Sequence, residues 1–82
     1  MIIKYPVSTE KSVKMIQTEN KLIFVVDRAA TKKEIKEEVE RLFNAKVIAI
    51  NTLTTPAAEK RAIVQFSDET PAIDIATKLG LM

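Results

Sequence analysis

The sequence contains no cysteine and no histidine. Without cysteine the chain forms neither a disulfide nor a nucleophilic thiolate, and without histidine it lacks the commonest zinc ligand and the usual general base near neutral pH. The acids Glu37, Glu38 and Glu40 lie along one predicted helix and do not form a pair of carboxylates converging on a substrate. We therefore expect no enzymatic activity, no metal ion and no cofactor.

Long apolar runs are also missing. No stretch approaches the roughly 20 residues that cross a bilayer, and Met1 to Tyr5 lacks the apolar run and cleavage site of a signal peptide. We expect a cytoplasmic protein without a membrane partner.

The chain has 82 residues, of which 46% are hydrophobic and 29% charged, a composition typical of a folded protein. This length predicts a single domain over residues 1–82 with modest stability.

Positive charge is concentrated in the first part of the sequence. The formal net charge is +2, but the segment up to Lys36 holds eight basic and four acidic residues, and the remainder is net −2. This asymmetry predicts one surface for a polyanion and another that faces water or protein.

Hydrophobic periodicity predicts three helices and three strands. Ser8 or Thr9 caps a short helix that runs to about Thr18, with Val13 and Ile16 facing inward. Thr31 and Glu34 form a capping box before a second helix, whose apolar face is Ile35, Val39, Leu42 and Phe43. Thr70 caps a third helix, with Pro71 in its first turn, Gly80 at its end, and an inward face of Ile73, Ala76 and Leu79.

The predicted strands are residues 21–26, 46–54 and 60–66, and the last two form a hairpin around the turn at 55–58. A strand, a crossover helix and a following strand favour a parallel pair, to which the hairpin adds an antiparallel neighbour. We predict an α+β fold: a small two-layer sandwich whose antiparallel or mixed sheet of about three to four strands has helices on one face. The other face carries Arg61, Ile63 and Gln65 and needs a partner.

Four strings resemble the large-subunit ribosomal protein 23 family, and the resemblance runs nearly end to end. Val7-Ser-Thr-Glu-Lys11 resembles the opening V-[ST]-E-K signature, and Ala30-Thr-Lys-Lys-Glu-Ile-Lys36 resembles the family's A-T-K-x-E-I-K helix start. Val47 to Leu53 ends in the family's N-T-L strand, and Lys60-Arg-Ala62 opens the last strand. The short turn at 55–59 and the absence of a long basic N-terminal extension resemble the archaeal members, which usually place basic and glycine residues where Ala57 and Ala58 stand.

The resemblance implies a ferredoxin-like arrangement and a structural role in the large ribosomal subunit. It implies binding to domain III of the large-subunit ribosomal RNA, beside ribosomal protein 29, at the exit of the polypeptide tunnel. It also implies a docking surface for factors that meet nascent chains, with the signal recognition particle expected for an archaeal type. Glu10 matches the glutamate that contacts such a factor in bacterial relatives, and we take it as a candidate docking residue.

Lys32, Lys33 and Lys36 crowd the first turns of the second helix, where lysines are unfavourable unless an anion lies nearby. A phosphate group would supply that anion. The alternative is a solvated face paired internally, Lys33 with Glu37 and Lys36 with Glu40. The other candidate RNA contacts are Lys11, Lys14, Asn51, Thr52, Lys60 and Arg61.

Two further interpretations remain open from the residues. Phe24 and Phe66 could stack on bases, as in RNA-recognition modules, but their alternation with small apolar residues favours the core. The alternative function is a ligand-sensing or dimerisation module of similar layout, which would self-associate through Ile63 and Gln65 and would not bind RNA.

Overall fold

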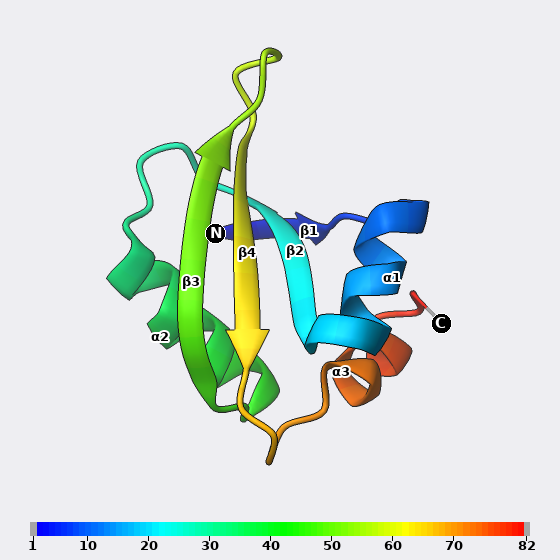
Figure 1. The fold of residues 1–82 in the computed structure, drawn as a ribbon. Coiled ribbons are helices and arrows are strands. Elements are labelled where there is room, and N and C mark those ends of the chain that lie inside the picture. Colours follow the sequence, from blue (N-terminus) through cyan, green and yellow to red (C-terminus); the bar gives the residue numbers. More distant parts are fainter. Residues whose placement is uncertain (1, 82) are drawn as a thin grey trace.

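The computed structural model describes residues 2–81, so Met1 and Met82 of the predicted domain lie outside the described residues. Seven elements follow one another along the chain (Figure 1). They are β1 (Ile3–Pro6), α1 (Glu10–Glu19), β2 (Lys21–Val26), α2 (Lys32–Phe43), β3 (Val47–Thr54), β4 (Lys60–Phe66) and α3 (Ala72–Lys78). The strands form one sheet in the order β1-β2-β4-β3, and every neighbouring pair is antiparallel. Within residues 2–81, no helix is long and apolar enough to cross a membrane.

The fully antiparallel sheet corrects one detail of the predicted topology. β2 and β3 run parallel, as the crossover through α2 predicts, but they are not hydrogen-bonded neighbours because β4 lies between them. Val64 of β4 lies opposite Leu22 on one side and Ile50 on the other. This split β-α-β arrangement lets the apolar strand β4 pair on both edges, so its amides and carbonyls are satisfied in the centre of the sheet.

Strand β1 is absent from the sequence prediction. It has four residues, of which Lys4 and Tyr5 are exposed, and it pairs antiparallel with β2 through a register shift between Ile3 and Tyr5. Such a short, interrupted segment has no clear alternation. Its pairing with β2 makes β2 an interior strand, between β1 and β4.

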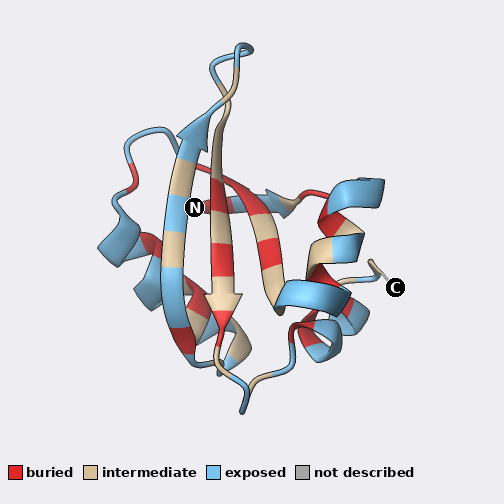
Figure 2. Ribbon diagram, in the orientation of Figure 1, coloured by how far each residue is buried: buried red, intermediate tan, exposed pale blue. Residues whose placement is uncertain are grey.

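One face of the sheet forms the core with the helices, and Figure 2 shows buried residues alternating with intermediate ones along β4. Phe24 and Phe66 are each 1% exposed, so their rings belong to the core and are not available for stacking on bases. From α2, the side chain of Phe43 stacks on Phe24 with ring centroids 5.9 Å apart. The remaining core residues come from all four strands and all three helices, among them Ile3, Ile16, Leu22, Val26, Ile35, Val39, Val47, Ala62, Ala72, Ile75 and Ala76.

Two predicted inward residues are exposed instead. Leu42 is 48% exposed and Ile73 is 42% exposed. In α2 the buried face consists of Ile35 and Val39, with Phe43 half-buried, so Leu42 lies outside the stripe. In α3 the packed face is Ala72, Ile75 and Ala76, which recur at the spacing of one helical face, and Ile73 lies outside that face.

The helix ends confirm most of the predicted caps. Thr9 and Thr31 are the N-caps of α1 and α2, and each accepts a hydrogen bond from the amide three residues on. Gly80 follows α3 with φ of 78°, as expected for a C-terminal cap. The predicted cap Thr70 is wrong: its hydroxyl accepts a hydrogen bond from the amide of Lys46 at 3.1 Å, and the N-cap of α3 is Pro71.

Asn20 connects the first half of the chain to the last. It ends α1 in the left-handed conformation, with φ of 56°. Its side-chain Nδ2 donates to the carbonyls of Phe66 and Ser67 at 3.0 Å and of Thr70 at 3.2 Å. Its Oδ1 accepts from the amide of Ala72 at 2.6 Å. One side chain therefore positions the end of β4 and the start of α3 against the turn between α1 and β2.

Replacing Asn20 with Asp tests this connection, because a carboxylate keeps the shape of the side chain but loses both donor hydrogens. We expect Asn20→Asp to lower the free energy of unfolding by about 2 to 4 kcal/mol, since carbonyls at the end of β4 lose their donor. Urea unfolding followed by circular dichroism measures the loss. The control is Asn44→Asp at the exposed left-handed C-cap of α2, which should cost less than about 1 kcal/mol. Equal losses in the two variants would contradict the role of Asn20.

The turn between β3 and β4 has a strained residue. Ala58 has φ of 60°, and it is the one non-polar side chain among the non-glycine residues with positive φ in residues 2–81. The amide of Ala58 donates to the carbonyl of Thr55, and the amide of Thr55 donates to the carbonyl of Glu59, each at 2.9 Å. These bonds hold the backbone in a conformation that costs an alanine roughly 1 to 2 kcal/mol. Glycine would occupy this position without that cost.

We predict that Ala58→Gly raises the free energy of unfolding by about 0.5 to 1 kcal/mol, because relief of the left-handed conformation outweighs the added freedom of the unfolded chain. Ala57→Gly is the matched control at a position without positive φ, and it should lower stability by a similar amount. Both changes are measured by thermal or urea unfolding. A loss of stability in both variants would show that Ala58 is not strained.

Candidate nucleic-acid interface

Three lysines of α2 lie together beside the outer edge of β3. Lys32, Lys33 and Lys36 are exposed and line a groove of about 300 Å³ whose other wall is residues 48–50 of β3. The first turn of α2 adds the positive end of the helix dipole. Within residues 2–81, none of these lysines forms an ion pair. The groove therefore holds three unneutralised charges next to a helix N-terminus.

The predicted internal pairing of these lysines is not formed. Glu40, the expected partner of Lys36, accepts a hydrogen bond from the amide of Val47 at 3.2 Å and so joins α2 to the start of β3. In the part of the chain that the structure describes, Lys33 and Glu37 do not form an ion pair either. The ion pair within α2 is Arg41 with Glu38, near the far end of the helix.

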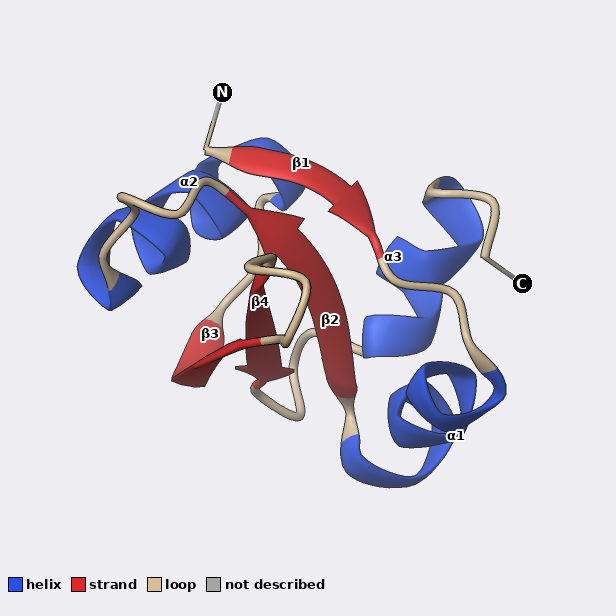
Figure 3. Ribbon diagram, turned by 90° about the horizontal axis from the view of Figure 1, so that it is seen from above, coloured by secondary structure: helices blue, strands red, loops and turns tan. Residues whose placement is uncertain are grey.

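Lys11 and Lys14 do not extend this groove. They are exposed on α1, which packs on the same face of the sheet as α2 but lies apart from it, across the molecule, in both views (Figures 1 and 3). Glu10 lies in the first turn of the same helix and is also exposed. The structure therefore places the candidate basic residues on two separate surfaces, and the candidate docking residue Glu10 beside the smaller one.

Lys60 and Arg61 are both candidate RNA contacts, but they do not share a face of the sheet because successive residues of a strand point to opposite faces. The Nζ of Lys60 donates to the carbonyl of Ala30 at 2.6 Å, so Lys60 ties the start of β4 to the segment before α2. Arg61 points to the open face of the sheet and is ion-paired with Glu59. Asn51 and Thr52 are divided in the same way: Asn51 is exposed opposite Ile63, and Thr52 is half-buried opposite the core residue Ala62.

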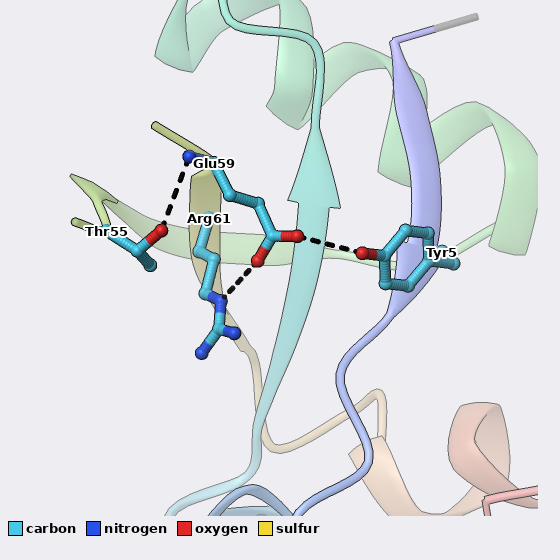
Figure 4. Close-up of polar contacts among 4 residues, drawn as sticks. All are labelled: Tyr5, Thr55, Glu59 and Arg61. Atoms are coloured by element: carbon cyan, nitrogen blue, oxygen red, sulfur yellow. Dashed lines mark hydrogen bonds and ion pairs between the residues drawn. The ribbon is translucent and has the colours of Figure 1, made fainter. Parts of the chain in front are cut away.

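Glu59 is the centre of a polar cluster that the sequence did not indicate. Its carboxylate accepts from the Tyr5 hydroxyl at 2.9 Å and from the Arg61 Nε at 3.0 Å, while its amide donates to the Thr55 hydroxyl at 3.3 Å (Figure 4). Tyr5 and Arg61 lie opposite Val25 from either side, so the cluster spans three strands above that residue. This explains why Val25 is 3% exposed on the open face of the sheet.

These hydrogen bonds change the acidity of both partners. The pKa of Tyr5 lies above its ordinary value of 10.0, chiefly because its hydroxyl donates to Glu59, and less because of burial and the carboxylate charge. The pKa of Glu59 lies below its ordinary value of 4.5, first because of the Tyr5 hydrogen bond and then because of that from Arg61. Glu59 therefore stays ionised at neutral pH and offsets the charge of Arg61.

No group of three acidic side chains that could hold a metal ion occurs in residues 2–81.

Comparison with known proteins identifies the family. The family described as ribosomal protein L23 matches residues 1–75. A protein from Pyrobaculum aerophilum, named large ribosomal subunit protein uL23, is 51% identical over 81 residues, which cover 99% of this chain and 100% of that protein. Proteins of the same name from Methanococcus vannielii and Methanococcus aeolicus are 45% and 42% identical over 80 residues. The chain belongs to the ribosomal protein L23 family.

Membership of the L23 family confirms the resemblance that the four sequence strings predicted. The relatives are archaeal and nearly equal in length to this chain, in agreement with the archaeal features of its short turn. They are named as large-subunit proteins of the ribosome, and none is named as an enzyme. The ribosomal location expected from the sequence agrees with these names.

The Tyr5 hydroxyl offers a direct test of the polar cluster in this L23-family chain. We expect Glu59→Gln to lower the pKa of Tyr5 toward 10.0, because the ionised acceptor beside the phenol is lost. The chain has one tyrosine and no tryptophan, so ultraviolet absorbance against pH reports this group alone. Glu38→Gln, on α2, is the control and should leave the titration unchanged. An unchanged pKa in Glu59→Gln would show that the two side chains do not meet in solution.

Proposed function

We propose that this chain is a structural component of the large ribosomal subunit that binds ribosomal RNA through the lysine groove, defined as Lys32, Lys33 and Lys36 with residues 48–50. The observation that supports the proposal is the accumulation of three unpaired cations at the N-terminal end of a helix. Such a site suits phosphate oxygens, which accept hydrogen bonds from ammonium groups without reading the base sequence. The family supports the same conclusion.

The finer location follows the family resemblance. We propose that the RNA partner is domain III of the large-subunit RNA, near the exit of the polypeptide tunnel and beside ribosomal protein 29.

The other candidate contacts contribute to RNA binding to different degrees. Lys11 and Lys14 are free to meet a second RNA segment, and Asn51 is exposed on the open face. Arg61 is partly neutralised by Glu59, and the ammonium of Lys60 already has a partner, so both should contribute less than the groove.

Docking of nascent-chain factors is the second part of the proposal. Glu10 lies exposed at the start of α1, on the side of the molecule away from the lysine groove. If the groove faces RNA, α1 stays accessible to a factor such as the signal recognition particle. The simpler role for Glu10 is to stabilise α1, because an acidic side chain in the first turn interacts favourably with the helix dipole. Loss of factor binding in Glu10→Gln subunits, with unchanged assembly, distinguishes the two roles.

Replacing Lys32, Lys33 and Lys36 with alanine tests the groove. The slope of log affinity against log salt should fall by about 2 to 3 units, at roughly 0.7 to 0.9 per lost phosphate contact. The measurement is binding to a domain III fragment across a salt series, against an unrelated structured RNA of equal length. A triple variant of the exposed lysines Lys4, Lys46 and Lys78 removes the same charge elsewhere and should change the slope less.

An equal fall of the slope in both triple variants would mean that net charge, and not the groove, drives binding. Equal affinity for the two RNAs, lost at moderate salt, would contradict a preference for domain III.

Sedimentation of the protein with and without RNA tests the alternative function. Self-association without RNA affinity would favour a dimerisation module that uses Ile63 and Gln65 on the open face.

A further inference from the structure

The lysine groove has two walls of different chemistry. One wall carries the exposed side chains of Lys32, Lys33 and Lys36, and the other is formed by residues 48–50 of β3, which are isoleucine, alanine and isoleucine. Phosphate groups bind through charge and hydrogen bonds, so they account for the first wall but not for the second. The apolar wall fits a second, flat and less polar group of the same ligand.

Ile48 is turned out of the core by an irregularity in β3. The pairing of β3 with β4 shifts register between Val47 and Ala49, and Ile48 lies in this shift. The side chain of Val47 is buried and that of Ile50 packs against the core, whereas Ile48 is 57% exposed. It is the most exposed large apolar side chain in residues 2–81. A bulge of this kind redirects one side chain without ending the strand.

The outer edge of β3 adds backbone groups to the apolar wall. β3 is last in the sheet order, so no strand in the described part of the chain pairs with this edge. The amide of Val47 donates to Glu40 of α2 at 3.2 Å. Apart from their pairing with β4, residues 48–50 form no backbone hydrogen bond within residues 2–81. The groove therefore combines cations, an exposed apolar side chain and the edge of a strand.

We propose that the groove takes an RNA nucleotide whose base is unstacked, as at a bulge or in a loop. The base lies against Ile48, its polar edge faces the outer edge of β3, and the adjoining phosphates meet the three lysines. Bases that leave the helical stack commonly pack against aromatic or apolar side chains. The inference rests on the proposed function, because it names the form of RNA that occupies the same groove.

The size and charge of the groove favour this occupant over others. Its volume of about 300 Å³ lies at the lower end of the range for small-ligand sites, which suits one nucleotide. A continuous duplex keeps its bases paired and stacked, so its backbone would use the lysine wall alone. An apolar protein segment would use the other wall and leave three lysine charges without a counterion.

The experiment compares three RNA hairpins that differ only in the stem. The first stem is continuous, the second carries one bulged adenosine, and the third carries an abasic residue in place of that adenosine. Their affinities for the intact protein are measured by fluorescence anisotropy at one salt concentration. We expect the adenosine bulge to bind about tenfold more tightly than the other two, because it alone offers a phosphate and a free base together. The abasic hairpin controls for the flexibility that a bulge adds.

Contact with Ile48 is observed by NMR of the intact protein with labelled isoleucine methyl groups. A base that lies against Ile48 should move its methyl signal upfield through the ring current. The abasic hairpin should not produce this shift. The signal of Ile73, which lies on α3 outside the groove, should stay unchanged with every hairpin.

Substitutions of Ile48 separate the base contact from the phosphate contacts. Since Ile48 lies outside the core, both variants should fold. Ile48→Ser should reduce the tenfold preference to about twofold or less and leave the slope of log affinity against log salt unchanged, because the lysines remain. Ile48→Val should keep most of the preference. Leu53→Ser is the matched control, since Leu53 is 44% exposed on the same strand but does not line the groove.

Equal affinity for the three hairpins, or a full preference in Ile48→Ser, would overturn the inference. Movement of the Ile48 signal with protein concentration, without RNA, would identify a second copy of the chain as the occupant. The proposed function fails in a different way. If the triple lysine variant lowers the salt slope while the hairpins bind equally, RNA binding by the groove stands and the unstacked base does not. An unchanged slope in that variant would contradict the proposed function itself.

Discussion

Asn20 joins elements that lie far apart in the sequence, and the arrangement of these elements depends on its hydrogen bonds. Its left-handed backbone ends α1, and β2 begins at the next residue. Its amide side chain forms hydrogen bonds with the backbone at the end of β4 and at the start of α3. Because four hydrogen bonds converge on one side chain, the start of β2, the end of β4 and the start of α3 cannot shift independently. A hollow of about 660 Å³ lies at this junction, and Asn20 is among the residues that line it.

The pleat of β4 determines which face of the sheet each candidate residue of that strand occupies, and therefore which groups it can contact. Alternation sends Ala62, Val64 and Phe66 to the core and leaves Arg61 on the open face, where Glu59 and Tyr5 join it above Val25. The same alternation turns Lys60 toward Ala30. Two adjacent basic residues therefore have different partners, although both are candidate RNA contacts in the sequence.

Charge is separated around the molecule in a way that suits a ribosomal protein of the L23 family. The lysine groove combines three unpaired cations with a helix N-terminus, and such a surface attracts polyanions. The hollow of about 660 Å³ where β2 begins and β4 ends is lined mainly by uncharged residues, and its lysine, Lys21, is paired with Glu19. The net positive charge of the sequence up to Lys36 anticipates the groove, but α1 and its lysines lie apart from α2.

The sequence by itself determined the helices, the threonine caps of α1 and α2, the hairpin, the buried phenylalanines and the family, because periodicity, capping and short motifs are local properties. Only the tertiary structure decided that β4 lies between β2 and β3, that β1 joins the sheet, and that Ile73 and Leu42 face outward. It also decided that Glu59 meets Tyr5 across three strands. These facts depend on residues far apart in the chain, whose contacts arise from strand pairing and packing that no local pattern specifies.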